Sequence, residues 1–123
     1  MRLLLVDDHR NARMALALGL GGFDVEVETA GSGAEALEAL GREPCDWVVT
    51  DVRMPGMTGV DLAACVRERC PQTRLLLLTA YDVSEDERVR IAGFGAELLI
   101  KPVTAAVVAA RCGLRIHPRA QDA

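Results

Sequence analysis

Short, continuous apolar runs recur along the chain and alternate with longer polar segments. Runs of this kind cover residues 2–6, 46–50, 74–78 and 97–100. Their length and lack of alternation predict strands that are buried on both faces. Residues 23–29 instead alternate apolar and charged side chains, which predicts a half-exposed strand near the edge of a sheet.

The segments between these strands carry helical signals. Three of them begin with a hydroxyl residue followed three positions later by an acid, the pattern of a helix capping box. These pairs are Ser32 and Glu35, Thr58 and Asp61, and Ser84 and Glu87. Residues 31–36 also fit the dinucleotide pattern G-x-G-x-x-A. We favour the capping interpretation, because in a dinucleotide-binding fold the first strand, not the second, would carry that fingerprint.

Two further helices are predicted at residues 10–20 and 104–114. The first would end at the glycines that follow it. Its apolar faces would come from Met14, Ala15, Leu16 and Leu18. Five strands alternating with five helices predict a parallel sheet covered on both faces. We therefore predict an α/β fold, flavodoxin-like and doubly wound, with strand order 2-1-3-4-5.

The length and composition fit a single small domain. We predict that residues 1–116 form it and that residues 117–123 are a polar C-terminal tail. The net charge of −4 provides no electrostatic footprint for nucleic acid or an anionic membrane, and no apolar run has the length of a membrane span or an export signal. The four cysteines lack C-x-x-C spacing, which indicates reduced thiols in a cytoplasmic protein.

Polar groups stand at the ends of four predicted strands. Asp7 and Asp8 follow the first, Asp51 ends the third, Thr79 follows the fourth and Lys101 follows the fifth. The predicted strand order places the first strand beside the third, so the three carboxylates should meet at the edge where such sheets bind ligands. Lys101 is also the chain's one lysine beside thirteen arginines.

Such a carboxylate cluster needs a counter-charge. Two unit charges 4 Å apart cost about 4 kcal/mol at an effective dielectric constant of about 20. An oxygen-only donor set favours a hard cation, Mg²⁺ rather than zinc. A metal ion, the Lys101 ammonium, the Thr79 hydroxyl and an ionised aspartate together form a phosphoryl-transfer site, with Asp51 as the best nucleophile candidate.

The chain resembles the receiver domain of two-component response regulators over nearly its full length. The resemblance rests on four segments: Val6-Asp7-Asp8, Thr50-Asp51-Val52-Arg53-Met54-Pro55-Gly56-Met57-Thr58-Gly59, Leu78-Thr79-Ala80 and Ile100-Lys101-Pro102. It implies that Asp51 accepts phosphate from a phosphohistidine of a sensor histidine kinase or phosphotransfer protein. A receiver catalyses only its own phosphorylation and dephosphorylation, so the resemblance implies a signalling domain rather than an enzyme.

The resemblance also implies roles for the other residues of the site. Asp8, Asp51 and the backbone carbonyl of Arg53 would bind Mg²⁺ directly, and Asp7 would act through a metal-bound water. Lys101 would pair with the phosphoryl group and Thr79 would move to bind it. The Lys101–Pro102 peptide is often cis in such domains. The face made by the fourth helix, fifth strand and fifth helix would bind an effector or a second copy, with Val107, Val108 and Arg111 as candidate residues, although core packing explains the two valines equally well.

One departure from the family concerns the switch. Leu98 stands three residues before Lys101, where family members usually carry Tyr or Phe as the switch that moves with the threonine. As a hypothesis, Tyr81 gates the site instead. Leu98 also keeps open a degenerate receiver that acts as a phosphorylation-independent docking or dimerisation module. A haloacid-dehalogenase-type phosphatase is disfavoured because Arg53 replaces the second acid of its D-x-D motif. A flavin- or nucleotide-binding module is disfavoured because Asp7 and Asp8 would repel a phosphate.

Overall fold

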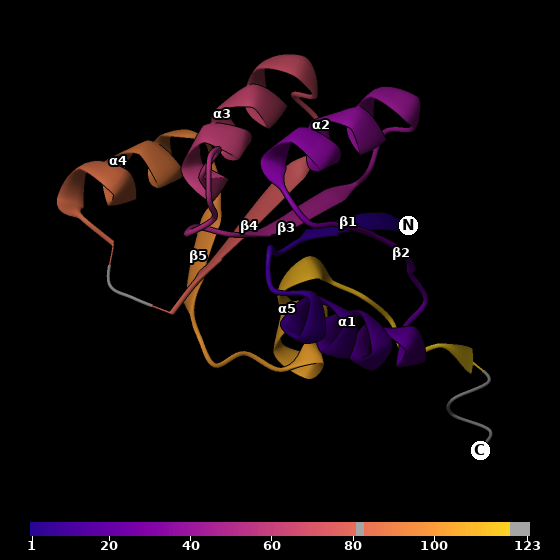
Figure 1. The fold of residues 1–123 in the computed structure, drawn as a ribbon. Helices are drawn as coiled ribbons and strands as arrows, with labels where there is room; N and C mark the ends of the chain where they lie inside the picture. Colours follow the sequence, from indigo (N-terminus) through magenta and orange to yellow (C-terminus); the bar gives the residue numbers. More distant parts are fainter. Residues whose placement is uncertain (81–82, 119–123) are drawn as a thin grey trace.

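In the computed structural model, five parallel strands form one sheet between two layers of helices (Figure 1). The structure describes residues 1–80 and 83–118. The sheet order is β2-β1-β3-β4-β5, as predicted. The strands are β1 (Arg2–Val6), β2 (Glu26–Ala30), β3 (Trp47–Asp51), β4 (Arg74–Thr79) and β5 (Glu97–Ile100). The α-helices are α1 (Arg10–Gly19), α2 (Gly33–Arg42), α3 (Gly59–Arg69), α4 (Glu85–Gly93) and α5 (Ala105–Cys112).

The helices cover the two faces of the sheet unequally. α2, α3 and α4 lie on one face, and α1 and α5 lie on the other (Figure 1). In β1, Leu4 and Val6 face the first layer while Leu3 and Leu5 face the second. Both sets are buried, so the central strands are continuous apolar runs rather than alternating ones.

The start of β2 differs from the prediction. The strand begins at Glu26, three residues later than the alternating pattern indicated. Phe23 forms an antiparallel bridge with Ile116, and Asp24 N–H donates to the Arg115 carbonyl at 2.7 Å. The chain after α5 thus supplies a partner that no local pattern shows. The division into a domain at residues 1–116 and a tail at 117–123 stays a prediction, and residues 119–123 lie outside the described part.

Helix α1 exposes part of its apolar surface. It ends at Gly19, and a 3₁₀ turn (Leu20–Gly22) follows it. Leu16 packs against the core, whereas Leu18 is 78% exposed and Met14 is 45% exposed, so the side chains predicted to form the apolar faces do not all meet the core. No residue of α1 is buried, although the helix lies beside α5 on its face of the sheet (Figure 1).

The predicted caps account for where the helices begin. Reciprocal capping boxes at Thr58 with Asp61 and Ser84 with Glu87 are confirmed. Ser32 caps α2 through Glu35 N–H at 3.1 Å, which supports the capping interpretation of that segment. The Glu35 carboxylate accepts from Gly31 N–H instead of Ser32 N–H, so that box is only half formed.

Candidate functional site

The strand ends bring the predicted polar groups to one edge of the sheet. Val6 pairs with Thr50, Asp51 with Leu78, and Thr79 with Ile100. In this register, the residues that follow β1 and β5 lie on either side of Asp51 and Thr79. The predicted convergence is therefore confirmed for the carboxylates and the lysine, and we call Asp7, Asp8, Asp51 and Lys101 the acidic site.

Lys101 supplies positive charge to this cluster. Its Nζ lies 2.6 Å from Asp51 Oδ1 and 3.7 Å from Asp7 Oδ2. The Asp51 side chain is only 7% exposed, so little water screens the pair. One ammonium against three carboxylates leaves the acidic site with excess negative charge.

The pKa of Asp51 reflects this environment. The pKa of the Asp51 carboxyl is raised to about 6: burial is the largest cause, Lys101 opposes the rise, and the neighbouring Asp7 adds to it. Burial disfavours the charged form because the carboxylate loses its hydration. A cation bound beside Asp51 would therefore stabilise the ionised form of its carboxyl group.

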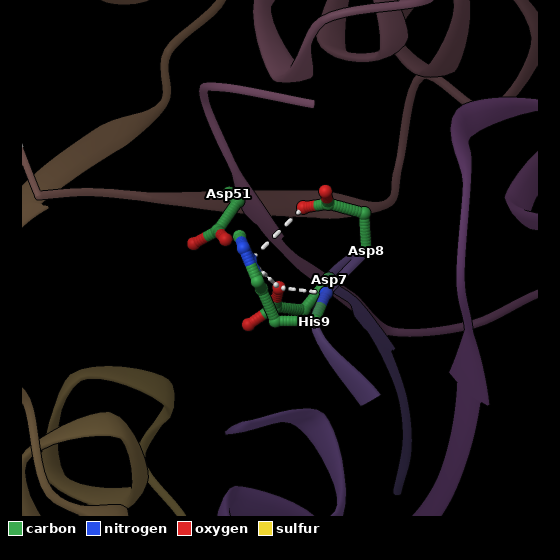
Figure 2. Close-up of side chains that lie close together, drawn as sticks. All are labelled: Asp7, Asp8, His9 and Asp51. Carbon is green, nitrogen blue, oxygen red and sulfur yellow. Dashed lines mark hydrogen bonds and ion pairs between the residues drawn. The ribbon is translucent and has the colours of Figure 1, made fainter. Parts of the chain in front are cut away.

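The donor atoms fit a divalent cation. Asp8 Oδ1 and Asp51 Oδ1 are both inaccessible to solvent, and the charged group close to Asp51 Oδ1 is the Lys101 ammonium at 2.6 Å. Ligand atoms of Asp7, Asp8, His9 and Asp51 all lie within 4.8 Å of one another. Figure 2 shows these four side chains turned toward a common point. Buried carboxylates that share a single ammonium keep uncompensated negative charge, which costs free energy that a bound cation would remove.

His9 belongs to this cluster and was not predicted. Its Nδ1 lies 3.3 Å from Asp8 Oδ1 and 3.5 Å from Asp7 Oδ1 (Figure 2). The only sequence signal was its position directly after the two acids. That signal is weak, because a residue at the start of a helix normally faces solvent. The imidazole is 73% exposed and covers the outer side of the acidic site.

A small cavity opens next to Asp51. It has a volume of about 120 Å³. Its lining is made by Asp51, Thr79, Lys101, His9, Arg53, Leu78 and Ala80. Thr79 and Lys101 therefore border the same space as the Asp51 carboxylate, where a group attached to that carboxylate would lie.

The loop after β3 is held by close backbone packing. Gly59 N–H donates to the Val52 carbonyl at 2.8 Å, and Val52 N–H donates to the Leu78 carbonyl at 2.8 Å. A Cβ atom on Gly59 would overlap the backbone oxygen of Asp51. Gly56 has a φ of 74°, which favours glycine in the turn. The loop geometry thus depends on glycine at both positions.

Arg53 connects this loop to α4. Its guanidinium makes a bidentate pair with Glu87, with both N–O distances 2.8 Å. Glu87 also accepts from Ser84 N–H in the α4 capping box, and the Arg53 pair lowers the pKa of its carboxyl. The segment two residues past Asp51 and the first turn of α4 are therefore linked by charge-assisted hydrogen bonds.

The candidate switch and partner residues separate in the structure. Leu98 is half-buried and packs against the core beneath α3 and α4, and Tyr81 lies outside the described residues. Val108 is completely buried, so its candidacy for a partner face is wrong, whereas Val107 is 41% exposed. Arg111 pairs with Glu97 at 2.5 Å on the same side. The Lys101–Pro102 peptide is cis.

Comparisons with known proteins agree with this geometry. Residues 3–112 match the family model of the response regulator receiver domain. The chain is 37% identical to response regulator protein PilR of Pseudomonas aeruginosa over 98% of its own length but 28% of that protein, and 39% identical to response regulator protein FleR of the same organism over 85% and 22%. It thus spans about a quarter of these curated relatives.

A solved structure gives the same result. Chemotaxis protein CheY4 of Vibrio cholerae superposes with a TM-score of 0.81 at 30% identity, covering 91% of this chain and 95% of that one. No helix within residues 1–80 and 83–118 is long and apolar enough to cross a membrane. With the sheet order and the placement of Asp7, Asp8, Asp51 and Lys101, these matches establish that the chain belongs to the response regulator receiver domain family.

Proposed function

We propose that Asp51 is the phosphoacceptor and takes its phosphoryl group from a phosphohistidine in the presence of Mg²⁺. One observation carries this proposal: the Asp51 carboxylate ends a buried strand, 2.6 Å from Lys101 Nζ, beside two more carboxylates. Receiver domains interact with histidine kinases or phosphotransfer proteins and are signalling domains rather than classical enzymes. The four cysteines are free thiols, which supports a cytoplasmic location.

In this reaction an Asp51 oxygen attacks the phosphorus. The P–N bond of the phosphohistidine breaks, its electron pair returns to the imidazole nitrogen, and an acyl phosphate forms on Asp51. Lys101 leaves its pair with the free carboxylate and binds a phosphoryl oxygen, and Thr79 donates its hydroxyl to another. The cavity beside Asp51, which Lys101 and Thr79 both line, supports both roles.

The proposed metal set is Asp8, Asp51 and the Arg53 backbone carbonyl, with Asp7 acting through a water. These oxygens would hold Mg²⁺, which would supply positive charge to offset the negative charge of the carboxylates and the phosphoryl group. Asp7 also accepts from His9 N–H at 2.9 Å, which holds its carboxylate in place at the start of α1. The phosphorylation-independent docking module is not favoured, because the nucleophile, the acids and the lysine are all assembled.

The test of this function is intact-mass measurement after incubation with acetyl phosphate. We expect the chain to gain one phosphoryl group with Mg²⁺ and none with EDTA, and borohydride trapping should locate the modification at Asp51. The added mass should be lost in base, as for any acyl phosphate. An unmodified chain, under conditions that label another receiver domain, would contradict the proposal and favour the docking module.

A surface for the kinase is proposed on α1. Met14 and Leu18 are exposed apolar side chains one helical turn apart, on the helix that starts next to the acidic site. We infer that a phosphohistidine-bearing partner covers them while its histidine reaches Asp51. The face of α4, β5 and α5 exposes Val89, Ile100 and Val107 instead, and we assign it to an effector or a second copy of the chain.

The α1 surface can be tested with Leu18→Arg. We expect at least a tenfold lower rate of phosphotransfer from a phosphorylated sensor kinase that labels the wild type, because a buried charge replaces an apolar contact. Labelling by acetyl phosphate should not change, since that donor needs no docking surface. Val89→Arg, on the opposite face, is the matched control. Equal loss in both variants would assign the docking surface elsewhere.

A further inference from the structure

The imidazole of His9 has no structural task that explains its position. His9 is the N-cap residue of α1, yet its side chain makes no capping hydrogen bond. Its backbone N–H already donates to Asp7 Oδ1 at 2.9 Å, so the side chain is not needed to hold this turn. The ring nevertheless turns toward the carboxylates rather than away from them (Figure 2).

The position of the ring suits a metal ligand. Nδ1 lies 3.3 Å from Asp8 Oδ1 and 3.5 Å from Asp7 Oδ1. A donor atom of Asp51 falls within the same 4.8 Å cluster. Distances of this size between donor atoms are those of neighbouring ligands around one ion, since metal–ligand bonds of about 2.1 Å at right angles separate two donors by about 3 Å.

We propose that His9 is a metal ligand that adapts the acidic site to first-row transition ions. This inference rests on the proposed function, which places a divalent cation among the same carboxylates. Imidazole nitrogen binds Ni²⁺ and Zn²⁺ strongly and adds little for Mg²⁺, which prefers oxygen donors. The oxygens of Asp8 and Asp51 then hold either kind of ion, and His9 decides how far the site discriminates between them.

A simpler role would be electrostatic. A protonated His9 beside two carboxylates would be an exposed ion pair, which contributes little. The two roles predict different results, because a ligand acts selectively on ions that favour nitrogen. A cationic side chain would instead repel every divalent ion alike, and its removal would strengthen binding of both Mg²⁺ and Ni²⁺.

The experiment is calorimetric titration of the purified chain with Ni²⁺ and, separately, with Mg²⁺ at about pH 7.5, where an ordinary imidazole is mostly neutral. The variants are His9→Asn and His117→Asn. Asparagine is a good N-cap residue, so the first change should leave the start of α1 intact. His117 is the chain's other histidine and is the matched control for nickel bound outside the acidic site.

We expect His9→Asn to weaken Ni²⁺ binding about tenfold or more and to change Mg²⁺ binding less than twofold, while His117→Asn alters neither. Asp8→Asn should weaken the binding of both ions. Equal changes for the two ions in His9→Asn, no change for either, or nickel binding that survives Asp8→Asn would overturn the ligand role. Failure of the wild type to bind Mg²⁺ would instead count against the proposed function, so the two ideas can fail separately.

Discussion

Replacing Asp51 by asparagine is expected to abolish phosphorylation and, in the metal-free protein, to increase the free energy of unfolding at neutral pH. The amide has no nucleophilic carboxylate oxygen, so no acyl phosphate can form. It also removes a buried charge whose burial raises the pKa of Asp51 to about 6. The same residue that the function requires therefore reduces the stability of the fold.

The pH dependence has a definite sign. The folded-state pKa of about 6 lies above the ordinary value of 3.8, so between these values the folded chain binds more protons than the unfolded one. Stability contributed by Asp51 is thus fully present below about pH 4 and is lost as pH rises through about 6. The Asn variant does not lose this stability. Its free energy of unfolding should therefore exceed that of the wild type by almost nothing at low pH and by on the order of 1–3 kcal/mol at neutral pH.

Urea unfolding in EDTA at about pH 4 and about pH 7 measures this difference. Asp24→Asn makes the same chemical change on an exposed residue and should show almost no pH-dependent gain. A less stable Asp51→Asn variant at neutral pH would show that the pair with Lys101 outweighs burial. Saturating Mg²⁺ should narrow the gap, because the ion binds only to the folded wild type with high affinity.

Gly59→Ala is expected to destabilise the fold by about 2–3 kcal/mol, the upper part of the typical range for overpacking. The new Cβ would overlap the backbone oxygen of Asp51 and lie 2.9 Å from Val52 Cα. Both obstacles are backbone atoms and cannot rotate away. The loop or the start of α3 must shift, which displaces the Asp51 carboxylate as well, so phosphorylation by acetyl phosphate should also slow.

The control for this substitution is Gly41→Ala, also inside a helix. Among the described residues, a Cβ on Gly41 meets no atom within 4 Å. Because alanine is the better helix former by about 1 kcal/mol, this variant should be slightly more stable than the wild type. Chemical denaturation of both variants gives the comparison. If Gly59→Ala proved as stable as the wild type, the loop would have relaxed around the new Cβ at little cost, which would contradict this prediction.

The strand ends were predictable because local pattern and sheet geometry act together. An apolar run followed by an acid, a hydroxyl or a lysine marks where a strand stops, and parallel strands stop at the same edge. Asp7, Asp51 and Lys101 could therefore be grouped without coordinates. The alternation at residues 23–29 suits an edge strand, and this agrees with the strand order 2-1-3-4-5 of a flavodoxin-like fold.

Contacts between distant segments could not be predicted in this way. Arg53 and Glu87 are 34 residues apart, and each looks like an ordinary surface charge in its own segment. Phe23 pairs with Ile116 through backbone groups that carry no sequence signal. Val107 and Val108 are chemically identical neighbours, and only the rotation of α5 on the sheet buries one and exposes the other.

The class of fold, the strand order and the residues of the acidic site could be predicted from the sequence, because hydrophobic periodicity and strand polarity act over a few residues at a time. The tertiary structure decided how deeply Asp51 is buried, that His9 turns toward the carboxylates, and that Leu18 faces solvent. Burial and side-chain direction depend on everything packed around a residue, and that packing exists only once the distant segments have come together.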